Sequence, residues 1–105
     1  MKLINKKILA SLPPLYSTEK IPLEEKTAVV HYFNPVGKGD WYVFEGGETE
    51  DGEVMFFGWV SLFDGELGYF SLRELEEVRV FRGLLGLERD LSFEPKKFSD
   101  IKALS

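Results

Sequence analysis

The sequence contains no cysteine and only one histidine, His31, among its 105 residues. The absence of cysteine excludes disulfide bonds, thiolate catalysis and zinc sites built on cysteine. No apolar run approaches the roughly 20 residues of a membrane helix, and the start MKLINKKILASLPP lacks the apolar stretch of about 7–15 residues that a signal peptide requires. We therefore expect a cytoplasmic protein that does not associate with a membrane.

Motifs of nucleotide, metal and nucleophile chemistry are missing as well. The segment VGKGD is shorter than a P-loop and lacks its Ser or Thr, and no serine lies in a GxSxG elbow that His31 would serve. The acidic segment EGGETEDGE, residues 45–53, lacks the ligand spacing of an EF-hand. We interpret it as a solvated hairpin loop and His31 as a structural or surface residue, and we expect no metal and no cofactor.

The negative charge is concentrated in the middle of the chain. The net charge is −5, and residues 21–94 carry sixteen acidic but only six basic residues. Nucleic-acid binding depends on a basic surface that releases counterions, so this distribution argues against a nucleic-acid partner. Two minor alternatives stay open: mimicry of DNA by rows of carboxylates, and single-strand binding in which aromatic side chains stack on bases and the lysine-rich ends meet.

The apolar and turn residues predict one α+β domain over residues 1–105. Segments 28–33, 41–46 and 53–63 are rich in β-branched and aromatic residues and predict an antiparallel meander. The alternation of mainly apolar with polar residues in LERDLSFEP, residues 87–95, predicts a further strand with one solvent-exposed face. Together these segments predict a twisted antiparallel sheet of four or five strands.

A tight turn is predicted after the third of these strands. Asp64-Gly65 is typical of a two-residue type I′ hairpin, because that turn needs positive φ at both positions. This register would place Val60 directly opposite Tyr69.

Helices are predicted at three places. Ser71 and Glu74 fit a capping box, which predicts the main helix over about residues 72–80. Short helices are predicted near the two termini, in KKILASL after the cap Asn5 and in KKFSDIKAL. We expect the main helix to cover one face of the sheet and the terminal segments to cover the other.

The central strands are apolar on both faces. VMFFGWV, residues 54–60, does not alternate as a strand with one wet face would. The sheet therefore needs two covers, and the terminal segments are short. We hypothesise that the second cover is incomplete and leaves an aromatic groove for a protein partner; a fully covered sheet is the alternative. The candidate binding residues are Tyr16, Trp41, Tyr42, Glu45, Phe57, Trp59, Tyr69, Arg89 and Glu94.

A small enzyme is the alternative function. Glu45, Asp90 and Glu94 are carboxylates of the kind that pair as general acid and base. Arg89 falls on the apolar side of its predicted strand, where a partly buried guanidinium needs a partner. Glu45 or an anionic ligand would supply that partner, and so would a purely structural ion pair.

Five segments occur in an order and spacing that resemble a small bacterial family of unknown function. They are LPPLYSTEKIPLEEK, WYVFEG, EDGEVMFFGWV, GELGYFSLRELE and GLERDLSFEP. The resemblance covers about residues 12–101, and only VRVFRGLLGLERD is a few residues longer than the family's usual link. Members are frequent on plasmids, phages and integrative elements, sometimes near antirestriction genes. The resemblance implies a mobile-element accessory protein, and we predict that it binds a host or defence protein.

Overall fold

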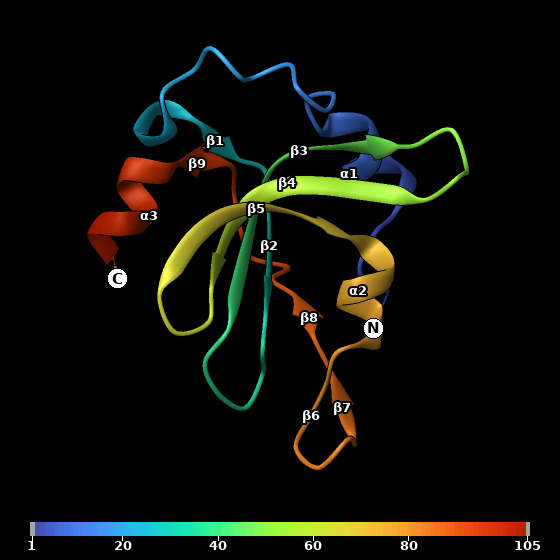
Figure 1. Ribbon diagram of the computed structural model, residues 1–105. Helices are drawn as coiled ribbons and strands as arrows, with labels where there is room; N and C mark the ends of the chain where they lie inside the picture. The colour runs from blue at the N-terminus through green and yellow to red at the C-terminus, as the bar shows by residue number, and fades with distance from the viewer. Residues whose placement is uncertain (1, 105) are drawn as a thin grey trace.

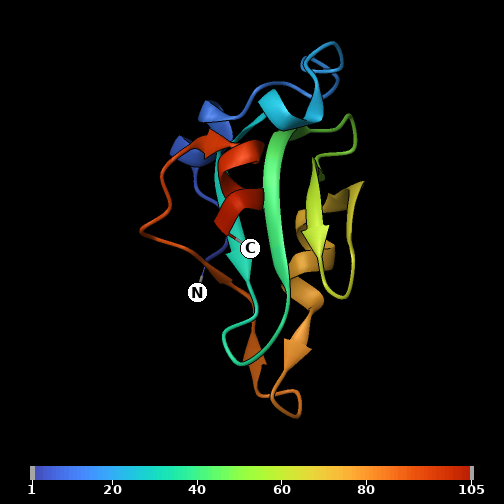
Figure 2. The same ribbon diagram turned by 90° about the vertical axis from the view of Figure 1, so that its left-hand side faces the viewer.

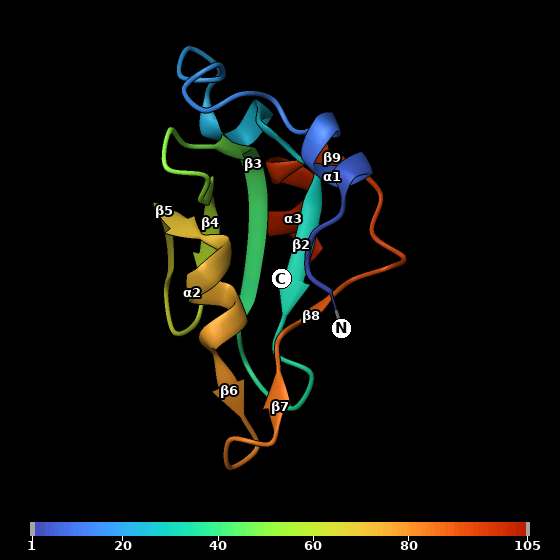
Figure 3. The same ribbon diagram turned by 90° about the vertical axis from the view of Figure 1, so that its right-hand side faces the viewer.

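The computed structural model describes the backbone of residues 2–104 and the side chains of residues 2–101. A five-stranded antiparallel sheet in the order β5-β4-β3-β2-β8 forms the centre of the protein (Figures 1 and 3). Its strands are β2 (Val30–Phe33), β3 (Asp40–Glu48), β4 (Val54–Ser61), β5 (Gly65–Ser71) and β8 (Glu88–Arg89). The predicted α+β class and antiparallel sheet are confirmed.

Short elements surround this sheet. Two further strand pairs are β1 (Thr27–Ala28) with β9 (Lys96–Lys97), and β6 (Arg79–Val80) with β7 (Leu85–Gly86). The helices are α1 (Lys6–Ser11), the 3-10 helix η1 (Leu23–Glu25), α2 (Leu72–Glu77) and α3 (Phe98–Leu104). All three predicted helices are therefore present.

The helix caps are those predicted. The side chain of Asn5 accepts a hydrogen bond from the N–H of Ile8 at 2.8 Å, and Ser71 Oγ accepts one from the N–H of Glu74 at 3.0 Å. However, α2 ends three residues before the predicted end at residue 80. Val78 is already extended, with φ −66° and ψ 128°, because Arg79 and the β-branched Val80 enter a strand pair instead.

The β6–β7 hairpin projects from the body of the protein (Figure 1). Its tip carries Phe81 and Arg82 with φ of 51° and 58°, a left-handed conformation that L-residues rarely adopt. The side chain of Phe81 is exposed there. This hairpin lies within VRVFRGLLGLERD, the segment in which the resemblance led us to expect a longer link.

The β4–β5 hairpin has a different register from the predicted one. Phe57, rather than Val60, lies opposite Tyr69. Gly65 does not have a positive φ, so the type I′ prediction is wrong. Gly65 instead lies against the Trp59 indole, where an added Cβ would approach Cζ2 to 2.1 Å. Close packing explains the glycine, and a longer loop makes the turn.

The predicted last strand is mostly absent. Only Glu88–Arg89 pairs with the sheet, against β2. Immediately afterwards Asp90 accepts a hydrogen bond from the N–H of Ser92 at 3.0 Å, and such local side-chain bonds compete with strand pairing. Leu91 is consequently exposed, and the prediction of a strand beyond Arg89 is wrong.

Two cores lie on the two faces of the sheet. The first face packs against α1 and α2, and its buried residues include Leu12, Tyr32, Phe56 and Leu75. The second face packs against α3 and η1 (Figure 2). Its buried residues are Ala28, Phe44, Phe98 and Ile101.

The cover of the first face corrects one prediction. The N-terminal segment shares this face with α2, whereas we predicted it on the opposite face. The Tyr32 hydroxyl, which donates to the Leu3 carbonyl oxygen at 2.7 Å, ties it there. The C-terminal helix covers the second face as predicted.

Candidate functional site

A β-bulge in β3 shapes the second face of the sheet. Val43 pairs with Gly58 and Glu45 pairs with Phe57, which leaves Phe44 as the extra residue. A bulge re-aims the side chains that follow it. Phe44 lies in the second core, on the side that normal alternation from Tyr42 gives it, and the bulge brings Glu45 to the same side, beside Phe57.

Glu45 anchors the irregular segment between α1 and η1. Its side chain is buried, and its Oε1 accepts a hydrogen bond from the N–H of Tyr16 at 2.7 Å. Its Oε2 accepts from both the N–H of Thr18, at 3.0 Å, and the Thr18 hydroxyl. We predicted Glu45 as part of a solvated loop, and this is wrong: its carboxylate has a structural task.

Lys26 completes this buried polar network. Its ammonium donates to the carbonyl oxygen of Thr18 and, at 3.1 Å, to the Thr18 hydroxyl oxygen. The same ammonium lies 5.8 Å from the centre of the Phe57 ring. Thr18 therefore links a buried cation to a buried anion, an arrangement that compensates the burial of both charges.

The anchored segment and the edge of the sheet enclose an apolar trough. We define the aromatic trough by Tyr16, Ile21, Phe57, Leu67 and Tyr69. The Tyr69 ring centre lies 6.0 Å from that of Tyr16 and 4.8 Å from that of Phe57. The cavity beside them, about 410 Å³, is lined by Ile21, Phe57, Leu67 and Tyr69 together with Glu45 and Lys26.

Most of the trough is open to solvent. Tyr16 is 60% exposed and Tyr69 is 51% exposed, while Ile21 and Leu67 are each 41% exposed. Phe57 is half-buried beneath them. The second cover is thus incomplete at this edge of the sheet.

The other candidate residues lie elsewhere. Trp59 packs against Phe98 of α3 with ring centres 4.8 Å apart, so α3 covers the second face at this position. Trp41 is buried in the first core, because neighbouring residues of a strand point to opposite faces. Glu94 is exposed in the turn that leads to β9. These three residues do not contribute to the trough.

Arg89 and Glu45 do not meet. Arg89 pairs with Tyr32 in the strand register and donates to the carbonyl oxygen of Lys2 at 3.1 Å. Arg89 also lines a cavity of about 650 Å³ with Lys7 of α1. Asp90 and Pro95 line the same cavity, but Lys96 and Lys97 do not.

His31 lies between two carboxylates that the sequence analysis did not connect with it. Its Nε2 is 2.7 Å from Asp40 Oδ1, and its Nδ1 is 3.1 Å from Asp90 Oδ2. Each ring nitrogen therefore faces one carboxylate. The ring stacks on Tyr42 with centres 4.4 Å apart. Burial, with the charges of Asp40 and Asp90, raises the pKa of the Tyr42 phenol.

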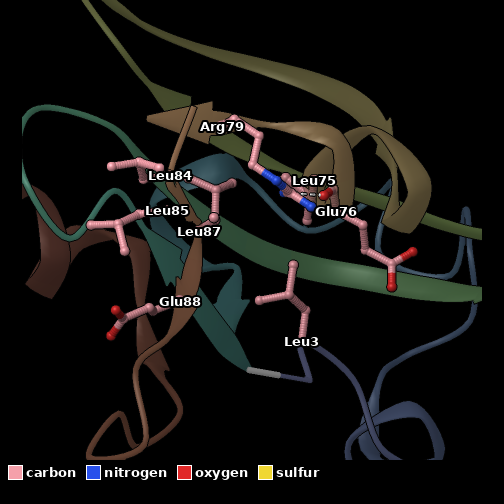
Figure 4. A pocket seen from close by; sticks show the side chains of 9 residues that line it. Leu3, Leu75, Glu76, Arg79, Leu84, Leu85, Leu87 and Glu88 are labelled. Atoms are coloured by element: carbon pink, nitrogen blue, oxygen red, sulfur yellow. Dashed lines mark hydrogen bonds between the residues drawn. The ribbon is translucent and has the colours of Figure 1, made fainter. Parts of the chain in front are cut away.

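A further cavity of about 480 Å³ lies beneath the β6–β7 hairpin and is walled mainly by leucines (Figure 4). Arg79 donates hydrogen bonds from Nη1 to the carbonyl oxygens of Glu76 and Val78. These bonds cap the C-terminal end of α2. The carboxylates of Glu76 and Glu88 point away from each other (Figure 4). These two carboxylates therefore do not converge on the cavity.

Comparison with known protein families gives a match that covers nearly all of the chain. The profile of a family described as "Protein of unknown function (DUF2958)" matches residues 3–101. No curated protein and no solved structure matches the chain. Among residues 2–104, no helix has the length and apolarity to span a membrane, and the described side chains include no three histidine or acidic groups arranged so that they could hold a metal ion.

Proposed function

We propose that this chain, which belongs to the DUF2958 family of proteins of unknown function, works by binding another protein through the aromatic trough. The exposure of Tyr16 and Tyr69 carries this proposal. Clustered exposed apolar side chains are typical of interaction sites, and tyrosine is enriched among residues that contribute strongly to binding.

The placement of the charged candidates supports binding over catalysis. Both oxygens of Glu45 accept hydrogen bonds from the segment that they anchor. Arg89 lies on the opposite face of the sheet, and both nitrogens of His31 face carboxylates. An enzyme needs polar groups that converge on one pocket, and these residues do not converge.

The finer proposal is an accessory role in a mobile element, with a host or defence protein as the partner. It rests on the resemblance of the segments from LPPLY to SFEP to a family frequent on plasmids and phages. The acidic middle of the chain is compatible with such a partner having a basic surface.

The test replaces Tyr69 by a photoreactive phenylalanine analogue in bacterial cells and maps crosslinked proteins. A partner crosslinked from this position, and bound at least tenfold more weakly by Tyr69→Ser, would support the proposal. Phe63→Ser is the matched control, because Phe63 is 99% exposed but lies outside the trough. The proposal fails if both variants bind every crosslinked partner as the wild type does.

A further inference from the structure

The trough borders an open edge of the central sheet. Among the described residues, β5 pairs only with β4, and Figure 3 shows it at the outer side of the sheet. Alternate residues of an edge strand direct their backbone N–H and C=O groups away from the sheet. Glu66, Leu67 and Tyr69 are exposed along this edge.

The β5 edge has little of the usual protection against strand addition. Natural edge strands are commonly blocked by charged side chains, above all lysine, by proline, by a bulge or by a covering segment, and of these β5 carries only the charge of Glu66. The strand GELGYFS contains neither lysine nor proline, and its pairing with β4 runs without a bulge over seven residue pairs. Gly68 at its middle has no neighbouring atom within 4 Å of an added Cβ, so the space there is open.

The trough supplies side-chain contacts on one side of this edge. Strand addition takes its affinity from backbone hydrogen bonds and its specificity from pockets for alternate side chains. Leu67 and Tyr69 are two residues apart and lie on one face, with Tyr16 and Ile21 beyond them. Every second side chain of an added strand would face these apolar groups.

Charge selects the kind of strand that fits. Residues 39–72, which include β3, β4 and β5, contain eight acidic residues and no lysine or arginine. On the edge itself, Glu66 is exposed next to Asp64. A second copy of the chain would bring the same negative charges together, whereas a basic segment would be attracted.

From these observations we infer that β5 accepts an extended segment of the partner protein as a sixth strand of the sheet, and that this segment alternates apolar residues with lysine or arginine. The inference rests on the proposed function and specifies its partner. The apolar residues pack against Leu67 and Tyr69, and the basic residues lie near Asp64 and Glu66.

The test uses a displayed library of random twelve-residue peptides selected against the full chain. We expect enriched peptides to alternate apolar and basic residues. Their synthetic versions should bind about tenfold more weakly to Tyr69→Ser, a substitution at an exposed position. Glu66→Lys should weaken them similarly at low salt, whereas Glu77→Lys, an exposed change on α2, should not.

Backbone methylation separates this inference from the proposed function. Methylation of the peptide nitrogens that face β5 should abolish binding, and methylation of the alternate nitrogens, which face away from β5, should leave the affinity unchanged. If peptides depend on Tyr69 but both methylated forms bind with equal affinity, strand addition is overturned while the protein-binding role stands. Binding that ignores Tyr69 would refute both. A dimer that Tyr69→Ser dissociates in sedimentation analysis would show that a second copy occupies the edge.

Discussion

Replacement of Glu45 by glutamine tests whether a buried carboxylate holds the segment between α1 and η1. The substitution keeps the shape of the side chain and removes its charge. Each oxygen of Glu45 faces a backbone N–H, that of Tyr16 or that of Thr18. In either orientation the amide nitrogen of glutamine would therefore place a donor against a donor.

The expected loss of stability is about 3–5 kcal/mol. A hydrogen bond to a charged group contributes about 1.5–3 kcal/mol, and Glu45→Gln removes at least one and weakens the others. Lys26, itself buried, would also lose the nearby negative charge, and breaking a buried ionic arrangement costs about 3–5 kcal/mol. At about 4–8 °C per kcal/mol, the melting temperature should fall by roughly 12 °C or more.

Urea unfolding followed by tryptophan fluorescence measures this loss. Glu48→Gln is the matched control, since Glu48 lies on the same strand but is exposed and should change the free energy of unfolding by less than about 0.5 kcal/mol. Trypsin should also cleave after Lys20 faster in Glu45→Gln. A Glu45→Gln protein as stable as the Glu48→Gln control would refute the anchoring role.

Three further outcomes are expected. Gly58→Ala should destabilise the protein by more than about 2 kcal/mol, because the added Cβ would lie 1.9 Å from the Tyr42 carbonyl oxygen, whereas Gly47→Ala meets no atom within 4 Å; equal urea midpoints would contradict this. His31→Leu should cost about 1 kcal/mol, because it leaves two partly exposed carboxylates without the ring nitrogens that they contact; an unchanged urea midpoint would contradict this. Burial raises the pKa of Tyr32, so the folded state keeps a proton that the unfolded chain loses above about pH 10. Stability should fall as pH rises beyond that value, and less steeply in Tyr32→Phe; parallel pH profiles of unfolding free energy would refute this.

Local signals in the sequence were reliable because short-range bonds decide them. The caps Asn5 and Ser71 act on N–H groups three residues away, so their geometry follows from adjacent residues alone. The end of α2 was less predictable. No residue before Val78 indicates that the chain after it forms β6 and pairs with β7.

The site depended on contacts that composition does not encode. Glu45 sits in a run of glycine and acidic residues, which is typical of a solvated loop. The β-bulge at Phe44 turns it inward, and the bulge depends on the pairing with β4. For the same reason the sequence could not show whether Arg89 and Glu45 form an ion pair. The strand pairing places them on opposite faces of one sheet.

His31 illustrates a partial signal. The strands VHYF and DWYVFEGGE are joined by a turn, and their pairing places Asp40 opposite Phe33, diagonally across from His31. A hairpin register drawn from the sequence would have suggested this contact. Asp90 arrives from a distant segment through its backbone N–H bond to the His31 carbonyl oxygen at 2.9 Å, and only the folded chain brings it there.

The same buried anchor explains why the trough can remain exposed. Tyr16 is 60% exposed, so its own ring contributes little burial energy to hold the segment in place. Glu45 holds it instead, through the backbone N–H of Tyr16. The aromatic ring is therefore positioned without being buried, and its apolar surface stays available to a partner. Loss of the Glu45 anchor should consequently weaken partner binding even though Glu45 itself lies beneath the surface.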